Sequence, residues 1–556
     1  MPWYCTPTGG TYEEARANFS WELPPDYNAA HDLLRKHDDP KARVALFQAY
    51  PDGRRETYTF HDLDVASNRL AHGLRERGVG RGDRVATIVP QKPENPLTHL
   101  ACWKLGAIAL PLSVLFGPDA LRYRLHNSGA SVVVADESVL ETVDAVADDC
   151  PALEHVVAVD TDGVPDGESA VETDTTTFEA VCADQPREFE VVETGPETPG
   201  VILYTSGSTG PPKGVLHTQA LWVGHCPAFQ LYFERDVLGK SVCWTPADWA
   251  WIGSLGDLLY PAWHYGRPVV GYPMGKFDAE TAYELLEEFG VTDAFLPPTA
   301  IRMMMDVEEP RERYDLSLDA VCSGGEPLTP EILTWADEEL EGTAVNELYG
   351  QTEANLLVTN CRGWFEARPG SMGKPVPGHD VTVVDEDGEE CPPGEVGDIA
   401  VRREGDPVVF EEYWEQPEKT AAAQRGPWHL TGDLGSRDDD GYLWFKSRAD
   451  DVIITAGYRV GPGEVESAIL EHEAVEQVGV VGVPDDTRGE IIKAFVQPVS
   501  SVEPNDDLRT AIQDLVRDSL AKYEYPRALE FVSELPQTTT GKIQRSALKA
   551  RDVEGS

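Results

Sequence analysis

Short apolar runs alternate with helix-like patterns over the N-terminal two thirds of the chain, and this alternation constrains the fold more than any other feature. The runs that predict buried strands are Val85–Val89, Ser131–Ala135, His155–Val159, Val201–Tyr204, Pro268–Gly271, Ala294–Leu296 and Ala320–Cys322. Between them, Leu63–Arg77, Ala279–Phe289 and Pro330–Leu340 carry apolar residues at i, i+3 and i+4. Strands and helices in alternation predict an α/β fold of largely parallel sheets covered by helices.

The pattern changes towards the C-terminus. From Gly378 to Arg402, Asp-Gly and Pro-Gly turns separate short strands, as in a small antiparallel β-barrel. Further on, the pattern is that of a mixed α+β domain, in which Gln477–Val483 and Ile491–Pro498 predict strands and Asp506–Leu520 predicts an amphipathic helix.

Length indicates several domains, because 556 residues exceed what one hydrophobic core usually organises. The short polar stretch SRADD is a plausible linker. We therefore expect a large N-terminal domain over 1–447, a hinge over 448–452 and a smaller, mobile α+β domain over 453–556. The Asp-, Thr- and Gly-rich segment Thr161–Thr177 is expected to be a loop.

Charge is the outlier of the composition. The 46 Lys and Arg residues against 97 Asp and Glu residues give a formal net charge of −51. The acid is spread along the chain, and there are only 14 Lys against 32 Arg. An acidic, Lys-poor surface predicts a cytosol at high salt, where screening suppresses self-repulsion, the alternative being an ordinary acidic enzyme. It disfavours non-specific binding to nucleic acid or to anionic membranes.

The cysteines and the N-terminus indicate the compartment. Nine Cys, an odd number without C-x-x-C spacing, disfavour a disulfide framework and a structural zinc site. The first residues, MPWYCTPTGG, have neither a basic nor an apolar signal region, and no run of 18 apolar residues occurs. We therefore expect a soluble, reduced, cytoplasmic protein without integral membrane contact.

The strongest chemical signal is TSGSTGPPKG, Thr205–Gly214, directly after an apolar strand. Its glycines let backbone N–H groups approach an anion, its hydroxyls add donors, and Lys213 adds a positive charge. These are the requirements of a polyphosphate site, although the spacing is not that of the P-loop. A flexible Ser/Gly loop is the alternative.

Three weaker motifs follow. YGQTE, Tyr349–Glu353, comes after the expected strand Ala344–Leu348, and a turn there would place an aromatic ring, a hydroxyl and a carboxylate where open α/β sheets bind ligands. TGD, Thr431–Asp433, suits a ribose diol, and TTTGKIQR, Thr538–Arg545, holds a lysine in a hydroxyl-rich loop. Turn chemistry and solvated side chains explain each equally well in isolation.

In this order, together with SGGEP at Ser323–Pro327 and SRADDVIITAGYRVGPGEVE at Ser447–Glu466, the motifs resemble the adenylate-forming, AMP-dependent acyl-CoA synthetases. The resemblance covers nearly the whole chain and is greatest to the medium-chain acyl-CoA synthetases. It implies that ATP and a carboxylic acid form an acyl-adenylate, from which coenzyme A takes the acyl group. The implied ATP- and AMP-binding residues are Thr205, Ser206, Gly207, Ser208, Thr209, Gly210, Lys213, Gly325, Glu326, Pro327, Glu347, Tyr349, Gly350, Gln351, Thr352, Asp433, Arg448 and Lys542.

The resemblance also implies roles. Lys213 meets the β- and γ-phosphates, Thr352 the α-phosphate, Glu353 helps hold Mg²⁺, and Lys542 reaches the substrate carboxylate and the α-phosphate. The C-terminal domain then turns on a hinge at Asp450 to form the thioester site. The residues expected to meet coenzyme A are Ala456, Gly457, Tyr458, Arg459, Arg488, Arg517, Tyr525 and Arg527.

Glycines carry the expectation about the acid. The predicted acyl-pocket residues are Trp249, Trp251, Ile252, Gly253, Gly324 and Gly350, and the two tryptophans are alternatively core residues. Acetate-specific relatives hold Trp in the slot of Gly350, so the resemblance favours a short- to medium-chain, branched or aromatic acid, and a tryptophan at this position is expected to favour acetate. An acetyl-CoA synthetase and a stand-alone adenylation enzyme with another acceptor are the alternatives; a catalytically dead regulator is disfavoured because the charged residues are all present.

Overall fold

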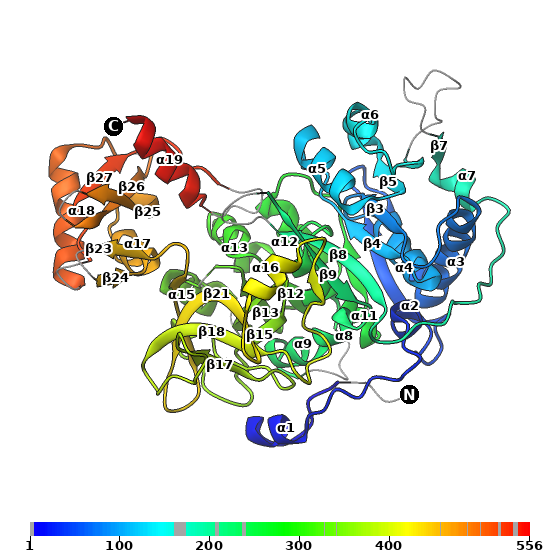
Figure 1. Ribbon diagram of the computed structural model, residues 1–556, viewed down its shortest axis with the longest axis horizontal. Helices are drawn as coiled ribbons and strands as arrows, with labels where there is room; N and C mark the ends of the chain where they lie inside the picture. The colour runs from blue at the N-terminus through cyan, green and yellow to red at the C-terminus, as the bar shows by residue number, and fades with distance from the viewer. Residues whose placement is uncertain are drawn as a thin grey trace. The chain divides into compact units, whose positions relative to one another are not determined.

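The computed structural model describes residues 5–160, 174–205, 211–235, 241–326, 328–340, 342–455, 458–485, 488–500, 502–520, 524–537 and 543–555. The chain divides into two compact units (Figure 1). The first comprises Met1–Gly207, Pro211–Val381 and Val401–Pro427, and the second comprises Ser208–Gly210, Thr382–Ala400 and Trp428–Ser556.

A nine-stranded sheet in the first unit has the order β16-β15-β14-β13-β12-β10-β11-β1-β2. Its strands are β1 (Val44–Ala49), β2 (Arg55–Thr59), β10 (Cys243–Trp244), β11 (Val269–Gly271), β12 (Asp293–Phe295), β13 (Ala320–Gly324), β14 (Ala344–Gln351), β15 (Asn355–Thr359) and β16 (Lys374–Pro375). Strands β14 to β1 run parallel, and β15, β16 and β2 are antiparallel additions. The carboxyl ends of β12, β13 and β14 therefore share one edge, where α/β sheets bind ligands.

An eight-stranded sheet in the same unit has the order β19-β9-β8-β4-β3-β5-β6-β7. Its strands are β3 (Arg84–Ile88), β4 (Ile108–Pro111), β5 (Val132–Asp136), β6 (His155–Val159), β7 (Asp174–Thr177), β8 (Pro199–Thr205), β9 (Lys213–Thr218) and β19 (Glu412–Tyr413). Strands β8 to β7 are parallel, whereas β9 and β19 are antiparallel. The parallel sheets predicted from the alternating pattern are confirmed.

Helices cover both sheets, as Figure 1 shows. The helices and short helical turns of this unit are α1 (Tyr12–Asn18), α2 (Ala29–Leu34), α3 (Phe60–Glu76), α4 (Glu94–Leu105), α5 (Pro118–Ser128), η1 (Glu137–Val139), α6 (Leu140–Ala147), α7 (Phe178–Cys182), α8 (Leu221–Gly224), α9 (Cys226–Tyr232), α10 (Ile252–Ser254), η2 (Leu255–Leu259), α11 (Tyr260–His264), α12 (Ala279–Glu288), α13 (Pro298–Met305), α14 (Pro310–Arg313), α15 (Pro330–Glu339) and α16 (Pro417–Ala422). Helix α3 begins with a reciprocal capping box between Thr59 and Asp62.

Strand β3 shows how the apolar runs are used. Val85 belongs to a core cluster that also takes side chains from both sheets and from α2 to α4. Its neighbours Ala86 and Ile88 point the other way, into a second cluster with α5 and α6. Alternate side chains of a strand face opposite sides of the sheet, so a continuous apolar run is what a sheet buried on both faces requires.

The second unit contains the C-terminal strands and helices. One sheet has the order β24-β23-β26-β25, with β27 paired to β26, and these elements are β23 (Ile453–Thr455), β24 (Tyr458–Val460), β25 (Val475–Asp485), β26 (Gly489–Pro498) and β27 (Ala528–Phe531). The helices are α17 (Pro462–Leu470), α18 (Asp506–Ser519) and α19 (Arg545–Gly555). One core cluster joins this sheet to α17 and α18, and another joins it to α19, as the predicted α+β pattern requires.

A five-stranded sheet has the order β17-β18-β21-β20, with β22 paired to β21. Its strands are β17 (Val381–Val384), β18 (Val396–Arg402), β20 (Gln424–Arg425), β21 (Trp428–Arg437) and β22 (Leu443–Arg448). This sheet occupies the region where turn-rich antiparallel structure was predicted. The hinge over 448–452 and the mobility of the domain after it stay predictions.

Two local predictions are wrong. The expected loop Thr161–Thr177 ends in strand β7, because the threonines at 175–177 pair in parallel with Val156–Ala158 at the sheet edge; residues 161–173 lie outside the described residues. The strand expected over Ala344–Leu348 is longer than predicted, because β14 continues to Gln351 in antiparallel pairing with β15.

All nine cysteines lie among the described residues, and each is a free thiol. No helix in the described part of the chain is long and apolar enough to cross a lipid bilayer.

Candidate functional site

Strands β8 and β9 place the first candidate residues. Thr205 ends β8, and Lys213 begins β9 directly opposite it in the antiparallel register. The return of the chain into β9 thus fixes the backbone of Lys213 beside the end of β8. Ser206, Gly207, Ser208, Thr209 and Gly210 lie outside the described residues, so the phosphate-binding role of this loop stays a prediction.

Lys213, Tyr413 and Glu353 gather in the first unit. The Lys213 ammonium lies 4.6 Å from the centre of the Tyr413 ring, a cation–π distance. The Tyr413 hydroxyl donates a hydrogen bond of 2.7 Å to Oε1 of Glu353, and Glu353 is only 8% exposed. Strand β19 holds Tyr413 in place by pairing with Val215 of β9. A predicted phosphate-binding cation and a predicted magnesium ligand therefore share one aromatic neighbour.

The turn after β14 is held from both sides. The backbone N–H of Phe410 donates to the carbonyl oxygen of Glu353 at 2.8 Å. The ring of His217 in β9 donates from Nε2 to the carbonyl oxygen of Thr352 at 2.6 Å. Burial lowers the pKa of His217 to about 3, so the ring stays neutral and keeps this bond at physiological pH. The two residues expected to meet the α-phosphate and the metal thus sit on a fixed backbone.

Gly325 and Glu326 follow the carboxyl end of β13, and Tyr349 lies near the carboxyl end of β14. Gly325 has a φ of +92°, a conformation that favours glycine. Glu326 pairs with Arg302 at 3.1 Å, and Tyr349 is half-buried opposite Val358 of β15. These predicted ATP- and AMP-binding residues therefore lie at or near strand ends of the nine-stranded sheet; Pro327 lies outside the described residues.

Glu347 gives a test by pH. Burial raises its pKa to about 8, while a backbone hydrogen bond from Leu328 acts in the opposite direction. The folded protein therefore holds a proton that an unfolded chain releases near the ordinary pKa of 4.5. This contribution to stability is fully present below that value, decreases as the pH rises, and is lost above a pH of about 8.

Replacing Glu347 with glutamine should therefore raise the melting temperature relative to wild type, and the gain should grow from about pH 5 to about pH 8 and then level off. Thermal unfolding at several pH values measures it. A difference independent of pH would contradict the buried, protonated carboxyl.

Asp433 and Arg448 face each other across β21 and β22 of the second unit. They are register partners, and Nε of Arg448 lies 3.5 Å from Oδ1 of Asp433 and 3.3 Å from Oδ1 of Asp450. Gly432 has a φ of +76° and accepts a backbone hydrogen bond from Ala449. The structure thus brings together two of the residues expected to bind ATP and AMP, and links them to the residue predicted as the hinge.

The residues expected to meet coenzyme A are dispersed over the second unit. Arg517 pairs with Asp514 at 2.7 Å on α18, and the backbone of Arg488 donates to Asp485. Arg527 is exposed and Tyr525 is half-buried. Tyr458 and Arg459 belong to β24. Ala456, Gly457 and Lys542 lie outside the described residues, and the coenzyme A site stays a prediction.

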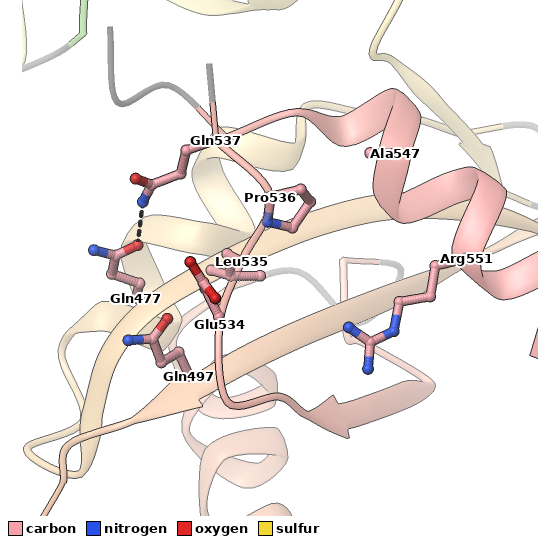
Figure 2. A pocket seen from close by; sticks show the side chains of 8 residues that line it. All are labelled: Gln477, Gln497, Glu534, Leu535, Pro536, Gln537, Ala547 and Arg551. Carbon is pink, nitrogen blue, oxygen red and sulfur yellow. Dashed lines mark hydrogen bonds between the residues drawn. The ribbon is translucent and has the colours of Figure 1, made fainter. Parts of the chain in front are cut away.

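Figure 2 shows an open pocket in the second unit that none of the predicted site residues lines. Its lining residues are Gln477, Gln497, Glu534, Leu535, Pro536, Gln537, Ala547 and Arg551. Gln537 donates a hydrogen bond of 2.7 Å to Gln477 on one side of it (Figure 2). Its lining contains no cluster of catalytic groups, and we assign it no ligand.

The predicted acyl-pocket residues differ in their exposure. Trp249 is fully buried in the main core cluster, where its carbonyl oxygen accepts from Asn95. Trp251 is half-buried and its ring meets Phe116 edge to face at 5.7 Å. Ile252 and Gly253 are also half-buried. Trp249 therefore lies in the core, which was the alternative to a place in the acyl pocket. Trp251, Ile252 and Gly253 keep partial access to solvent.

The three predicted pocket glycines have unequal room. A Cβ at Gly350 would lie 2.1 Å from the carbonyl oxygen of Asn355, and one at Gly324 would lie 2.3 Å from Cδ1 of Leu348. A Cβ at Gly253 would lie 3.2 Å from the Phe295 ring. A tryptophan at Gly350 therefore requires the β14–β15 hairpin to move, and it would report on the fold as well as on the acid. Position 253 is the gentler place to reduce the pocket.

Sequence reasoning missed Tyr413, His217 and Arg545. Arg545 binds Glu466 of α17 at 2.6 Å and Asp451 at 3.0 Å, so it ties the start of α19 to the residue next to Asp450. Arg545 is the last residue of the motif TTTGKIQR, whereas Tyr413 and His217 belong to none of the motifs. A tyrosine near the YGQTE carboxylate becomes visible only when β19 pairs with β9.

Comparisons with known proteins agree with this arrangement. The AMP-binding enzyme family model matches residues 35–414, and the AMP-binding enzyme C-terminal domain model matches residues 464–542. The acyl-coenzyme A synthetase ACSM4, mitochondrial, of Rattus norvegicus is 37% identical over 95% of this chain and 91% of its own length. The acetyl-coenzyme A synthetase of Bacillus subtilis (strain 168) is 36% identical over 98% and 95%.

Solved structures give the same result. The anthranilate CoA ligase AuaEII in complex with anthranoyl-AMP has a TM-score of 0.84 at 30% identity, over 96% of this chain and 98% of that chain. The acyl-CoA synthetase of Brucella canis has a TM-score of 0.74 at 34% identity, over 98% and 100%. The chain therefore belongs to the AMP-binding enzymes, the adenylate-forming family that its motifs resemble.

Proposed function

We propose that this protein is an AMP-forming acyl-CoA synthetase that activates a short- to medium-chain carboxylic acid. In the first step the carboxylate attacks the α-phosphorus of ATP, which gives the acyl-adenylate and releases pyrophosphate. In the second step the thiol of coenzyme A attacks the carbonyl carbon and releases AMP. The observation that carries the proposal is the cluster of Lys213, Tyr413 and Glu353 beside the strand that leads into the polyphosphate motif.

The first step is mainly a matter of position and charge, because negative charge shifts among the phosphate oxygens as pyrophosphate leaves. Lys213 supplies one fixed cation at the β- and γ-phosphates. Thr352 presents its hydroxyl at the α-phosphate from a turn that His217 and Phe410 hold. Lys542 supplies the second cation, at the substrate carboxylate and the α-phosphate.

Glu353 fits a magnesium ion that ATP brings with it. Mg²⁺ is usually held by one or two carboxylates together with waters and substrate phosphates. Glu353 supplies one such carboxylate, and Tyr413 already orients its Oε1. When bound, the ion would neutralise charge on the phosphates; the protein's own share is to hold the carboxylate still.

The second step needs the pantetheine thiol at the adenylate carbonyl. We infer that rotation at Asp450 withdraws Lys542 and brings up Gly457 and the residues around it, as the family resemblance implies. Arg459, Arg488, Arg517 and Arg527 are candidates for the phosphates of coenzyme A. Arg517 pairs with Asp514 at the surface, and such an ion pair contributes little stability, so exchanging this carboxylate for a phosphate costs little.

The acid is proposed from the pocket glycines. Gly253, Gly324 and Gly350 replace larger side chains of acetate-specific relatives and favour a longer, branched or aromatic acid. Acetyl-CoA synthetase activity is the second candidate, because the Bacillus subtilis relative at 36% identity bears that name. We further propose a cytoplasmic location and small-molecule substrates only.

Tyr413→Phe should lower kcat/KM for ATP by about 10- to 100-fold, since a hydrogen bond to a charged group contributes about 1.5–3 kcal/mol. The phenyl ring keeps the contact with Lys213, so the loss isolates the hydroxyl that orients Glu353. Steady-state pyrophosphate release at varied ATP measures it. A value within about twofold of wild type would show that the bond does not matter for the reaction.

Acid-dependent pyrophosphate release from ATP, with and without coenzyme A, tests the proposal as a whole. We expect slow or single-turnover release without coenzyme A, and sustained release with thioester formation when it is present. Sustained turnover that never yields a thioester would show a different acceptor, and no release with any acid would remove the enzymatic assignment.

A further inference from the structure

A buried carboxyl lies beside the predicted acyl pocket and has no role in the mechanism above. Asp257 belongs to the π-helical turn η2 (Leu255–Leu259) and is 5% exposed. Within the described ranges, its side-chain oxygens accept no hydrogen bond, and Nδ1 of His225 lies 3.2 Å from Oδ1. Such turns occur often at functional sites, and a buried carboxyl without hydrogen bonds is costly.

The fold positions His225 against this turn. A Cβ at Gly256 would lie 2.6 Å from the His225 ring, so the missing side chain lets the ring pack on the backbone of η2. Burial lowers the pKa of His225 to about 3 and raises the pKa of Asp257 well above its ordinary value. Burial thus disfavours the charged form of both groups, and an imidazole beside a carboxyl is a pair able both to donate and to accept hydrogen bonds.

The other oxygen of Asp257 faces the predicted pocket. A Cβ at Gly253 would lie 3.5 Å from Oδ2 of Asp257 and 3.2 Å from the ring of Phe295. Gly253 is half-buried, and Phe295 ends β12 at the edge where the parallel strands end. The carboxyl of Asp257, the ring of Phe295 and the bare backbone of Gly253 thus border one spot.

We propose that Asp257, supported by His225, binds a hydroxyl group on the acyl part of the substrate, so that the preferred acids are hydroxylated. The inference rests on the proposed function and on Gly253 lining the acyl pocket. A hydroxyl gives the carboxyl the hydrogen bond that the protein does not supply, whereas an alkyl or phenyl group of the same shape leaves it unpartnered. Sites that hydrogen-bond a substrate hydroxyl discriminate strongly against the analogue that lacks it.

Matched pairs of acids test the inference on the wild-type enzyme. The pairs are propionate and lactate, butyrate and 3-hydroxybutyrate, and benzoate with each monohydroxybenzoate, assayed for kcat/KM by pyrophosphate release with coenzyme A. We expect at least one hydroxylated acid to exceed its parent by about 10-fold or more. If every parent acid equals or exceeds its hydroxylated partner, the inference is overturned while the proposed function stands. If no acid releases pyrophosphate, both fall.

Two variants separate binding from packing. Asp257→Leu should remove the preference, with the hydroxylated acid losing about 10-fold or more relative to its parent, whereas Asp257→Asn, which keeps the hydrogen-bonding groups, should retain most of it. A structural role would lower both acids of a pair equally in both variants, and this would contradict the inference.

If Asp257→Leu does not fold, Gly253→Ala provides a second test of the inference. Its methyl group would occupy the space 3.5 Å from Oδ2. It should lower kcat/KM more for the hydroxylated acid than for its parent, and an equal or smaller loss for the hydroxylated acid would count against the assignment.

Discussion

Lys542→Ala is expected to slow adenylate formation by about 100- to 1,000-fold, the range seen when one group that stabilises developing charge is removed. The lysine is proposed to act on the substrate carboxylate and the α-phosphate, and both belong to the first step alone. Thioester formation from supplied acyl-adenylate and coenzyme A should therefore change little. The two half-reactions are measured separately, by pyrophosphate release and by acyl-CoA formation.

Lys549→Ala is the matched control, since it removes another lysine of the same C-terminal segment, on helix α19. It should leave both half-reactions near the wild-type rate. If Lys542→Ala slowed both half-reactions equally, the result would contradict the proposal that Lys542 acts in adenylate formation and is withdrawn before thioester formation.

The protein is expected to lose structure at low salt. The Debye length grows from about 3 Å at 1 M to about 30 Å at 0.01 M, so removing salt lets the net charge of −51 act across the whole surface. The melting temperature should rise steeply with KCl between these limits. The buried carboxylate of Asp32 does not add to this repulsion, because it pairs with Lys36 and His264 inside the core.

Sorbitol at matched osmolality is the control for the salt experiment, because excluded osmolytes favour the folded state without screening charge. A larger rise in melting temperature with KCl than with sorbitol would assign the difference to screening. If the melting temperature is the same at both ends of the KCl range, the prediction of a high-salt cytosol is contradicted.

The parts of the fold that the sequence predicts are those with local causes. Val85 and Ala86 face opposite core clusters, so a run of apolar residues was sufficient to predict a strand buried on both faces. Helix α18 was likewise predicted within a residue or two of its ends. The segment at Asp174–Thr177 was missed because only pairing with β6 turns a polar, Thr-rich stretch into a strand.

The candidate site divides in the same way. Lys213 and Glu353 could be named from motifs, but Tyr413 joins them through a two-residue strand far away in sequence. An irregular pairing between β14 and β15 sets the direction in which a side chain at position 350 would point. The lack of room at this position could therefore not be predicted from the residue type. Asp257 looked like one acid among many until burial beside His225 separated it from the others.

Transfer of an oxygen isotope tests the central claim most directly. The substrate acid is labelled with ¹⁸O at both carboxylate oxygens and converted to acyl-CoA with unlabelled ATP, and the nucleotide product is analysed by mass spectrometry. If the carboxylate attacks the α-phosphorus and coenzyme A then displaces AMP, each AMP carries one ¹⁸O and the pyrophosphate carries none. Label in phosphate or pyrophosphate, or unlabelled AMP beside labelled acyl-CoA, would contradict an acyl-adenylate intermediate and with it the proposed function.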